Sequence, residues 1–360
     1  MFHPWGGGVM PPLQDFCTTS TTSTKGGNMR ADRPHKFSTR AKAAYVGRAV
    51  SKWNNRGDGL ASAVRTMLND IRSETGLKTL SKIDKPTIEQ YLDSLRERLE
   101  SGELLSAATA DRVSALNTTL RYFGKGDQAV SAKEYGLSRG PVDTSDKSNS
   151  REASTAVVEA VYGKGQDDPR SMALYHSLRF QEAFGLRARE SLALKIAEKD
   201  PDAPRLIITK GDLPKNSRPR EIPIVSDQQR QVLWEAKAFA LSQGWRSLIP
   251  PEKSLAQGKD YAYKTLDKIR QSVGHPEFHF HGERHQYAHE RFASLFHAQA
   301  GLGLQCPAVM GLGTKEWREY AANATGLSIE QIKDIDKEIR LEISEELGHS
   351  RVDVTRYYLG

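Results

Sequence analysis

Hydrophobic residues recur three and four positions apart along most of this 360-residue chain, and this spacing limits the possible folds more than any other feature. Only two short runs have a β-type composition, residues 205–209 and 220–225, and the connection between them contains Gly211, Pro214 and Pro219. A connection of this composition between two short strands predicts a β-hairpin. The sequence therefore predicts a mainly α fold with a small β-sheet.

Helical periodicity, with proline and glycine near the boundaries, divides the chain into segments. The predicted helices are 41–53, 60–73, 87–100, 107–123, 153–163, 169–184 and 187–196. Residues 1–30 are rich in Gly, Pro, Ser and Thr, which predicts a flexible tail. We expect a helical domain over 31–137, a polar linker over 138–152 and a second domain over 153–360.

The composition excludes several classes of protein. Hydrophobic residues make up 38% of the chain and charged residues 27%, which is enough apolar material for ordinary cores. No run approaches the roughly 20 apolar residues of a membrane span, and glycines and prolines interrupt any signal-peptide core. Two distant cysteines, Cys17 and Cys306, exclude a disulfide framework or a cysteine-rich zinc site. We therefore expect a cytoplasmic protein without a membrane partner.

Basic residues are concentrated near the start of the first domain. The chain has 52 basic and 45 acidic residues, a net charge of +7, and the segment 33–57 contains no acidic residue at all. Helical spacing would place several of these cations on one stripe, which suits contact with nucleic-acid phosphates. A solvated helix face is the alternative, although such faces usually carry both signs of charge. The candidate DNA-binding residues are Arg40, Lys42, Arg48, Lys52 and Arg56.

Four short segments of the second half carry the residues best suited to catalysis. They are Gly185-Leu186-Arg187-Ala188-Arg189-Glu190, Thr209-Lys210-Gly211 followed by Arg218-Pro219-Arg220, His281-Gly282-Glu283-Arg284-His285, and Leu347-Gly348-His349 with Tyr358 nine residues after the histidine. Each segment alone is a weak signal, whereas all of them in this order form a strong one. The order resembles the tyrosine recombinases, the phage-type integrase family, and especially the integrases of prophages and integrative elements.

The resemblance covers roughly 165–360, and the helical segment 31–137 resembles the core-binding domain of the same family. It implies a helical core-binding domain and a tyrosine-recombinase catalytic domain that close as a clamp around duplex DNA. The residues matched to the family's catalytic positions are Arg187, Lys210, His281, Arg284, His349 and the nucleophile Tyr358. Glu190 is expected to support Arg187, because it lies three residues later on the same face of a helix.

These residue types suit the breaking and remaking of a phosphodiester. A tyrosine phenol has a pKa of about 10, so it must lose its proton as it attacks phosphorus. Two guanidiniums can stabilise the negative charge of the transition state. A lysine can protonate the departing 5′ oxygen, and imidazoles can take the tyrosine proton or donate to the phosphate. We expect neither a metal nor another cofactor.

The sequence departs from the family pattern in four places. Glu283 stands where a hydrophobic residue is common, and it either orients Arg284 or faces solvent. The hairpin loop, which contains Lys215, is longer than usual. The stretch 301–340 is interpreted as an insertion with a helix near 329–343. The sequence ends two residues after Tyr358, so contacts between subunits use other surfaces or the chain is trimmed.

Three neighbouring residues have simpler interpretations. Arg189 is expected to be a solvated surface arginine rather than a rival of Arg187. Tyr357 is expected to pack against the fold, because adjacent side chains on a helix diverge by about 100°. His285 and His289 are four residues apart, as a zinc pair would be, but the glutamate of a zincin motif is missing.

The sequence thus predicts a bacterial, nucleoid-associated site-specific recombinase that cuts and rejoins DNA through a 3′-phosphotyrosine and integrates or excises a mobile element. The expected partners are double-stranded attachment sites, three further copies of the chain in a synaptic tetramer formed from free monomers, and an excisionase or DNA-bending protein. Two alternatives remain: a non-catalytic DNA-binding relative, and a relaxing enzyme of the type IB topoisomerase kind.

Overall fold

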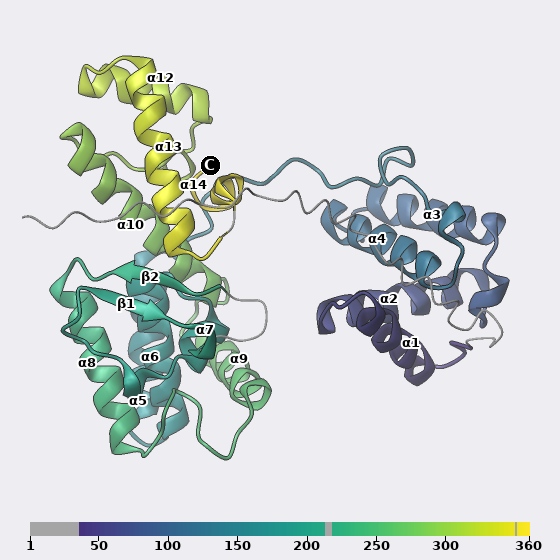
Figure 1. The fold of residues 1–360 in the computed structure, drawn as a ribbon, viewed down its shortest axis with the longest axis horizontal. Coiled ribbons are helices and arrows are strands. Elements are labelled where there is room, and N and C mark those ends of the chain that lie inside the picture. Colours follow the sequence, from purple (N-terminus) through teal and green to yellow (C-terminus); the bar gives the residue numbers. More distant parts are fainter. Residues whose placement is uncertain (1–35, 213–217, 350) are drawn as a thin grey trace, which may run out of the picture. The chain divides into compact units, whose positions relative to one another are not determined.

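The computed structural model of the protein describes residues 36–212, 218–349 and 351–360. The chain divides into two compact units between Pro141 and Val142 (Figure 1). The tail predicted for 1–30 lies outside the described residues, and so does Lys215.

The first unit is helical, and its helices share one apolar core. Its elements are α1 (Arg40–Trp53), α2 (Asp58–Thr75), α3 (Lys85–Glu100) and α4 (Ser106–Tyr122), with 3-10 turns η1 (Leu80–Lys82) and η2 (Gly126–Gln128). Helix α2 packs against the other three helices. Local signals set the helix starts: the side chains of Thr39 and Asp84 accept hydrogen bonds from the first turns of α1 and α3, and Pro86 fits the start of α3.

The second unit contains the hairpin and the remaining helices. Its elements are α5 (Arg151–Gly165), α6 (Pro169–Phe184), α7 (Ala188–Ala193), η3 (Ile196–Glu198), β1 (Arg205–Ile208), η4 (Lys210–Asp212), β2 (Arg220–Pro223), α8 (Asp227–Ser242), α9 (Leu255–Ser272), α10 (Phe280–Ala300), α11 (Pro307–Met310), α12 (Thr314–Thr325), α13 (Ile329–Glu346), η5 (Val352–Thr355) and α14 (Arg356–Leu359). The prediction of a mainly α fold with a small sheet is confirmed.

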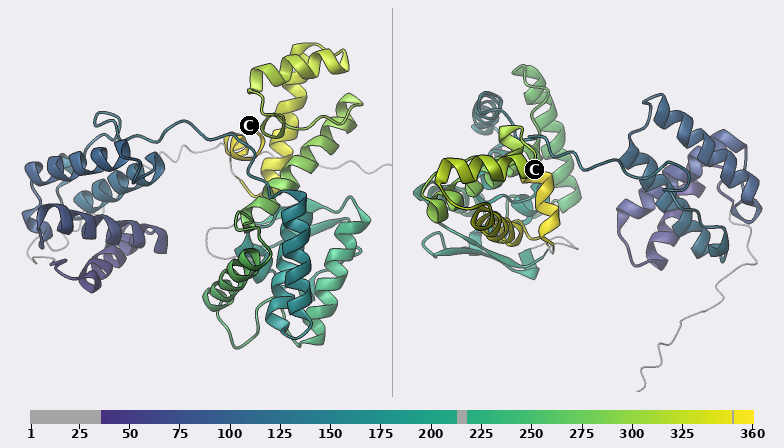
Figure 2. Two further views of the ribbon diagram at one scale, coloured as in Figure 1. Left: turned by 180° about the vertical axis from the view of Figure 1, so that it is seen from behind. Right: turned by 90° about the horizontal axis from the view of Figure 1, so that it is seen from above.

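Helix α6 forms the centre of this unit, since it packs against α5, α7, α8, α9 and α10 (Figure 2). Strands β1 and β2 pair antiparallel, with Ile208 opposite Arg220, and β2 also contacts the end of α13. The predicted insertion is part of the same core: Trp317 of α12 is fully buried, and its ring lies 5.4 Å from the rings of Phe292 and Phe296 in α10. Helix α10 contacts α13, and α13 contacts β2, so these three elements lie close together in the second unit.

The structure differs from the sequence-based description at the end of the first helix. Arg56 does not continue the helical stripe of Arg48 and Lys52, because α1 ends at Trp53 and the next turn contains Asn55 with φ +49°. The stretch 301–340, interpreted as an insertion with a helix near 329–343, contains α13 (Ile329–Glu346) and also α11 and α12, which were not predicted individually. Among the described residues, no helix has the length and apolar character that a membrane crossing requires.

Candidate active site

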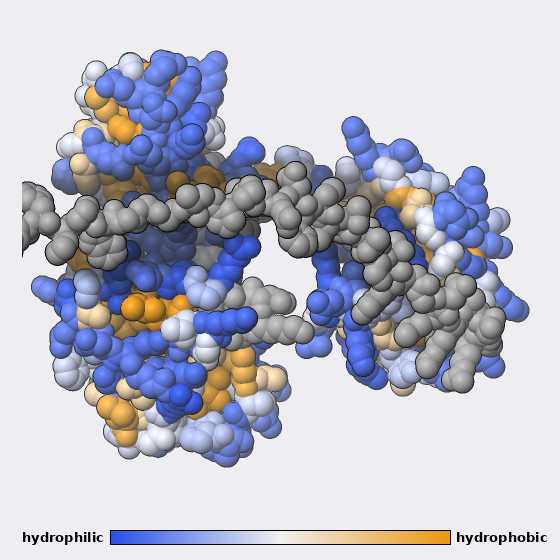
Figure 3. Space-filling view, viewed as in Figure 1, coloured by the Kyte–Doolittle hydropathy of each residue, from blue (hydrophilic) through white to orange (hydrophobic). Residues whose placement is uncertain are grey.

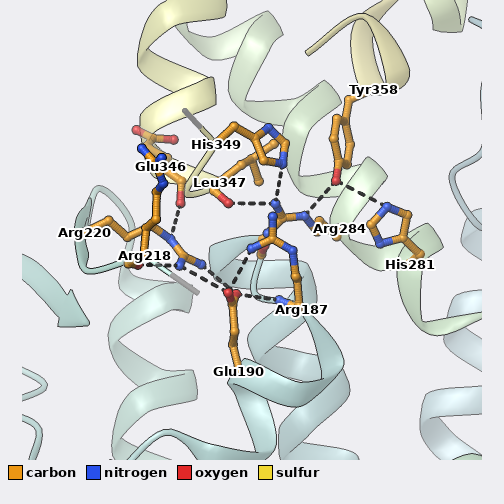
Figure 4. Close-up of polar contacts among 11 residues, drawn as sticks. Arg187, Glu190, Arg218, Arg220, His281, Arg284, Glu346, Leu347, His349 and Tyr358 are labelled. Atoms are coloured by element: carbon orange, nitrogen blue, oxygen red, sulfur yellow. Dashed lines mark hydrogen bonds and ion pairs between the residues drawn. The ribbon is translucent and has the colours of Figure 1, made fainter. Parts of the chain in front are cut away.

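The Tyr358 hydroxyl lies at one side of a polar cluster, beside Arg284 and His281 (Figure 4). It is 3.0 Å from Arg284 Nε and 3.2 Å from His281 Nε2. Its ring packs against the His285 ring at a centroid distance of 4.6 Å, and the residue is only 5% exposed. Tyr357 is 43% exposed, so the expectation that it packs against the fold is wrong. The structure brings Tyr358, and not its neighbour, to the predicted histidines and arginine.

Arg284 is fully buried and joins three segments of the chain. Its Nη1 donates to the Gly185 carbonyl, and its Nη2 donates to the Leu347 carbonyl at 2.7 Å and to His349 Nε2 at 3.0 Å. Burial lowers the pKa of Arg284 to about 10, so the guanidinium keeps its charge at neutral pH. A fixed cation therefore lies beside the phenol and an imidazole.

Two glycines allow the backbone to approach this arginine. Gly185 ends α6 with φ +58°, and a Cβ there would overlap the Tyr287 ring. Gly348 has φ +68°, and a Cβ there would lie 2.9 Å from Arg220 Nη1. Because both glycines adopt the left-handed conformation and have no room for a side chain, other residues would displace the loops that surround Arg284.

The two predicted catalytic histidines are neutral in the free protein. Burial, followed by the charge of Arg284, lowers the pKa of His281 to about 4 and that of His349 to about 3. Since Arg284 donates to His349 Nε2, the ring proton of His349 is on Nδ1. A neutral His281 has a free lone pair on one ring nitrogen, so its Nε2 is able to accept the phenol proton.

A carboxylate between two arginines forms the other side of the cluster. Glu190 is 2% exposed; it accepts a bond from Arg187 Nη1 at 2.9 Å and one from Arg220 Nη2 at 2.8 Å. Burial would raise the pKa of Glu190, but the charges of Arg220 and then Arg187 lower it to about 2. The side chain of Arg187 is 37% exposed, so this guanidinium is both oriented and accessible to a phosphate.

Arg220 is a site residue that the sequence analysis did not single out. Besides pairing with Glu190, it donates from Nε to the Glu346 carbonyl at 2.7 Å, and only 5% of its side chain is exposed. A signal was present: Arg220 and the buried Ile222 are two residues apart on a strand, so they point to the same face. A buried arginine needs a carboxylate partner, which here is Glu190.

The structure does not bring Lys210 into the cluster. It lies in η4 directly after β1, is exposed, and has no hydrogen bond or ion pair to any part of the chain that the structure describes. Arg189 is exposed as well, in agreement with its interpretation as a surface residue.

Glu283, His285 and His289 are all buried, and the surroundings of Glu283 differ from the expectation. Glu283 is 1% exposed and accepts a hydrogen bond from Asn149 at 2.7 Å, so it neither faces solvent nor orients Arg284. His289 Nε2 donates to the Tyr358 carbonyl at 2.7 Å, while His285 lies against the Tyr358 ring. Both histidines thus support the tyrosine. Within the described ranges, no group of three or more His, Cys, Asp or Glu side chains is arranged to hold a metal ion.

The five basic candidates of the first unit are all exposed. Arg40, Lys42, Arg48 and Lys52 lie on α1, and Arg56 lies in the loop that follows it. The face of this unit seen in Figure 3 is predominantly hydrophilic. These side chains are therefore free to contact a polyanion.

Comparison with known proteins identifies the fold. No family model matches the sequence, and no curated protein matches it. Among solved structures, the chain is similar to the XerH site-specific recombinase in a post-cleavage complex with palindromic difH substrate, at 16% identity and a TM-score of 0.50 over 89% of this chain and 80% of that one.

Two further similar structures are a Tn1549 transposon integrase in complex with transposon right end DNA and a lambda integrase dimer bound to a COC′ core site. The first has 12% identity and a TM-score of 0.47, covering 88% of this chain and 94% of that one. The second has 14% identity and a TM-score of 0.45, covering 81% and 77%. With its central helix α6, its hairpin and its C-terminal tyrosine helix, this chain has the fold of the tyrosine recombinases.

Proposed function

We propose that this chain is a site-specific DNA recombinase that cuts and rejoins duplex DNA through a 3′-phosphotyrosine on Tyr358, and that it integrates or excises a mobile element. The observation that carries the proposal is the contact of one phenol with both a buried guanidinium and a neutral imidazole, at 3.0 and 3.2 Å. The fold shared with a site-specific recombinase supports it.

The contacts of Tyr358 suggest the path of its proton. Arg284 Nε–H is a donor, so the phenol oxygen accepts from it and directs its own hydrogen toward His281 Nε2. As the phenol oxygen attacks phosphorus, His281 takes the proton. A bound phosphate is an anion next to the ring, and its charge would raise the pKa of His281 from its value of about 4 in the free protein. Phosphate binding thus makes His281 a better base when it is needed.

Cationic side chains would bind the non-bridging oxygens of the phosphate that Tyr358 attacks. Arg187 and Arg284 would donate to the non-bridging oxygens, and His349, once the anion favours its protonated form, would donate from Nε2 in place of accepting from Arg284. The P–O bond to the 5′ oxygen breaks as the bond to Tyr358 forms, and Lys210 would supply the proton to that oxygen after moving toward the site. A 5′ hydroxyl of another strand would then attack phosphorus and release the tyrosine.

The first unit would hold the duplex through Arg40, Lys42, Arg48, Lys52 and Arg56, because phosphate contacts position a protein on DNA without reading its sequence. Exchange of strands between two sites requires four cleavages, so we propose a homotetramer on paired attachment sites, assembled from monomers. An excisionase or DNA-bending protein would bias the direction of the reaction.

Covalent trapping tests the proposal. The full chain is incubated with nicked duplexes from the DNA that flanks its own gene, and complexes that survive detergent are recovered and sequenced. We expect wild-type protein and Tyr357→Phe to form such complexes and Tyr358→Phe to form none, since this substitution removes one oxygen and leaves the packing of the ring. Trapping by Tyr358→Phe, or no trapping by the wild type on any fragment, would refute the proposal.

The recovered site also separates the alternatives. On plasmids that carry two copies of the site, a recombinase gives products with exchanged flanks. A topoisomerase would instead change the linking number of any supercoiled plasmid, with or without the site. A non-catalytic relative would bind the site without forming a covalent complex.

A further inference from the structure

A side chain from the segment of the second unit that precedes α5 lies on the catalytic helix α10. Asn149 belongs to the predicted linker 138–152 and is 7% exposed. Its Oδ1 accepts from the His279 backbone N–H at 3.1 Å, and its Nδ2 donates to the His279 carbonyl at 3.0 Å and to Glu283 Oε1 at 2.7 Å. Both ends of the carboxamide are therefore used on the first turn of α10.

The helix is built to receive this carboxamide. His279 is the N-cap residue of α10, but its own side chain makes no capping hydrogen bond. A Cβ at Gly282 would overlap the carboxamide of Asn149, so the only glycine within α10 lies where the linker side chain needs the space. The contact thus depends on the N-cap residue and two positions of α10, and on one position of the predicted linker.

The catalytic side chains lie within the same turn. His281 precedes Glu283 by two residues and Arg284 follows it directly. A second linker residue lies farther along α10: Asp146 Oδ1 is 3.7 Å from His289 Nδ1, and the other nitrogen of that ring donates to the Tyr358 carbonyl. The linker therefore touches α10 on both sides of the residues that contact the Tyr358 hydroxyl.

Burying two polar side chains here costs free energy of desolvation, which apolar side chains of similar size would avoid. An apolar side chain at position 283 would avoid the cost of burying a carboxylate, so simple packing does not explain Glu283. Hydrogen bonds differ from apolar contacts in that they fix direction as well as distance. The Asn149–Glu283 pair can hold the rotation of the first turn of α10, and a small rotation there would move His281 and Arg284 relative to Tyr358.

We propose that Asn149 is a positioning residue: from the linker, and with Glu283 as its partner, it holds the first turn of α10 so that His281 and Arg284 meet Tyr358. This proposal rests on the proposed recombinase function for the reaction that the geometry serves. It assigns to the segment predicted as a linker a direct part in forming the site.

Four variants of the full chain test the role. Asn149→Ala removes all three hydrogen bonds. At about pH 8.5, where Glu283 is ionised, Asn149→Asp places a second carboxylate against Glu283, and the double variant Asn149→Asp/Glu283→Gln replaces that repulsion with an amide donor facing the new carboxylate. Ser145→Ala is the matched control, because this exposed linker hydroxyl bonds only to Asp143 within the linker.

The first readout, amide hydrogen exchange of the free protein, needs no DNA. We expect exchange in 280–285 to rise roughly tenfold in Asn149→Ala, to rise further in Asn149→Asp, and to recover partly in the double variant, with Ser145→Ala unchanged. Unchanged exchange in Asn149→Ala, or no recovery in the double variant, would overturn the proposal. If Asn149→Ala does not fold, the comparison of Asn149→Asp with the double variant still decides.

The second readout is the rate of covalent complex formation on the nicked duplex recovered in the trapping experiment. We expect Asn149→Ala to slow it on the order of 10- to 100-fold with DNA affinity changed less than about twofold, because misplaced groups cost rate rather than binding. A lower unfolding temperature with an unchanged rate would show a merely structural role and overturn the proposal. Failure of the wild type to form any complex would count against the recombinase function, and hydrogen exchange would still report on Asn149.

Discussion

Arg187 and Arg284 carry the same charge in different surroundings, and lysine substitutions should separate their roles. Arg284→Lys keeps the charge but leaves the buried carbonyls of Gly185 and Leu347 without donors. We expect covalent complex formation to slow on the order of 10²-fold or more in both Arg187→Lys and Arg284→Lys, with DNA affinity nearly normal. Single-turnover trapping and filter binding measure the two quantities.

Thermal unfolding distinguishes the two variants further. Arg284→Lys should lose about 1–3 kcal/mol of stability, because unpaired buried carbonyls are costly. The side chain of Arg187 is 37% exposed, and Glu190 keeps its bond to Arg220, so Arg187→Lys should be nearly as stable as the wild type. Cleavage at the wild-type rate in Arg187→Lys would assign its role to another arginine, such as Arg189.

Arg220 should matter more for stability than any exposed ion pair of the hairpin. Arg220→Ala leaves the buried Glu190 carboxylate with Arg187 alone and removes the donor to the Glu346 carbonyl. We expect a loss of about 3 kcal/mol in urea unfolding. The control is Arg205→Ala, which breaks the exposed pair with Glu221 on the same two strands and should cost under about 1 kcal/mol. Equal losses in the two variants would contradict the assigned role of Glu190 and Arg220.

At the scale of single elements, α1 offers a test of DNA contact. Neutralising Arg48, Lys52 and Arg56 should weaken binding to every duplex and reduce the slope of log affinity against log salt by up to about three. The outcome should not depend on Arg56 being helical, because it is exposed in the loop after α1. Neutralising Lys78, Lys82 and Lys85, near η1 and the start of α3, changes the net charge equally. An unchanged slope in the first variant would show that the basic residues form only a solvated face.

The sequence was most informative where local signals act. Helix α6 was predicted with both of its ends, because Asp168-Pro169 and Gly185 mark them. Helix α12 was not predicted individually: glycines flank it, and only Trp317 and Ala321 of its residues are fully buried. Arg56 was misplaced because helical spacing continues past the point where Asn55 turns the backbone.

In the candidate site, too, features that depend on nearby residues were predicted from the sequence, and contacts between distant segments were not. The motifs predicted a set of catalytic residues from residue type and order, and the fold brings these residues, except Lys210, into one cluster. They did not show that Arg220 shares Glu190 with Arg187, nor that Asn149 binds Glu283, because each of these contacts joins segments far apart in the chain. Residue type therefore predicted roles, while the supporting contacts required the fold.

For the whole molecule, buried histidines should make stability depend on pH. Burial lowers the pKa of His176 to about 4 and that of His285 to about 3, from an ordinary value of 6.5. Below pH 6.5 these histidines are therefore protonated in the unfolded chain but neutral in the folded chain. The free energy of unfolding consequently falls as pH decreases from 6.5 toward 4. At pH 5 each of these two histidines should lower the free energy of unfolding by about 2 kcal/mol.

Glu283 has the opposite sign, because burial raises its pKa to about 7 from 4.5. Between pH 4.5 and 7 the folded chain holds a proton there that the unfolded chain has lost, so this group stabilises the fold at low pH and loses that effect as pH rises to 7. Urea unfolding at pH 7, 6 and 5 should show a flatter pH dependence in His176→Phe and a steeper one in Glu283→Gln. A wild-type profile in both variants would contradict these assignments.

The bonds of Arg284 also bear on the order in which the protein folds. They tie residue 284 to Gly185, 99 positions earlier, and to Leu347, 63 positions later. Contacts across such separations form only after long loops have closed, whereas helices such as α6 and α10 form from near neighbours. We therefore expect Tyr358 to gain its partners late, after the hairpin, α10 and the loop after α13 have assembled. An incompletely folded chain with exposed cations would then bind DNA without the means to cut it, and competence for cleavage would arrive together with the finished structure.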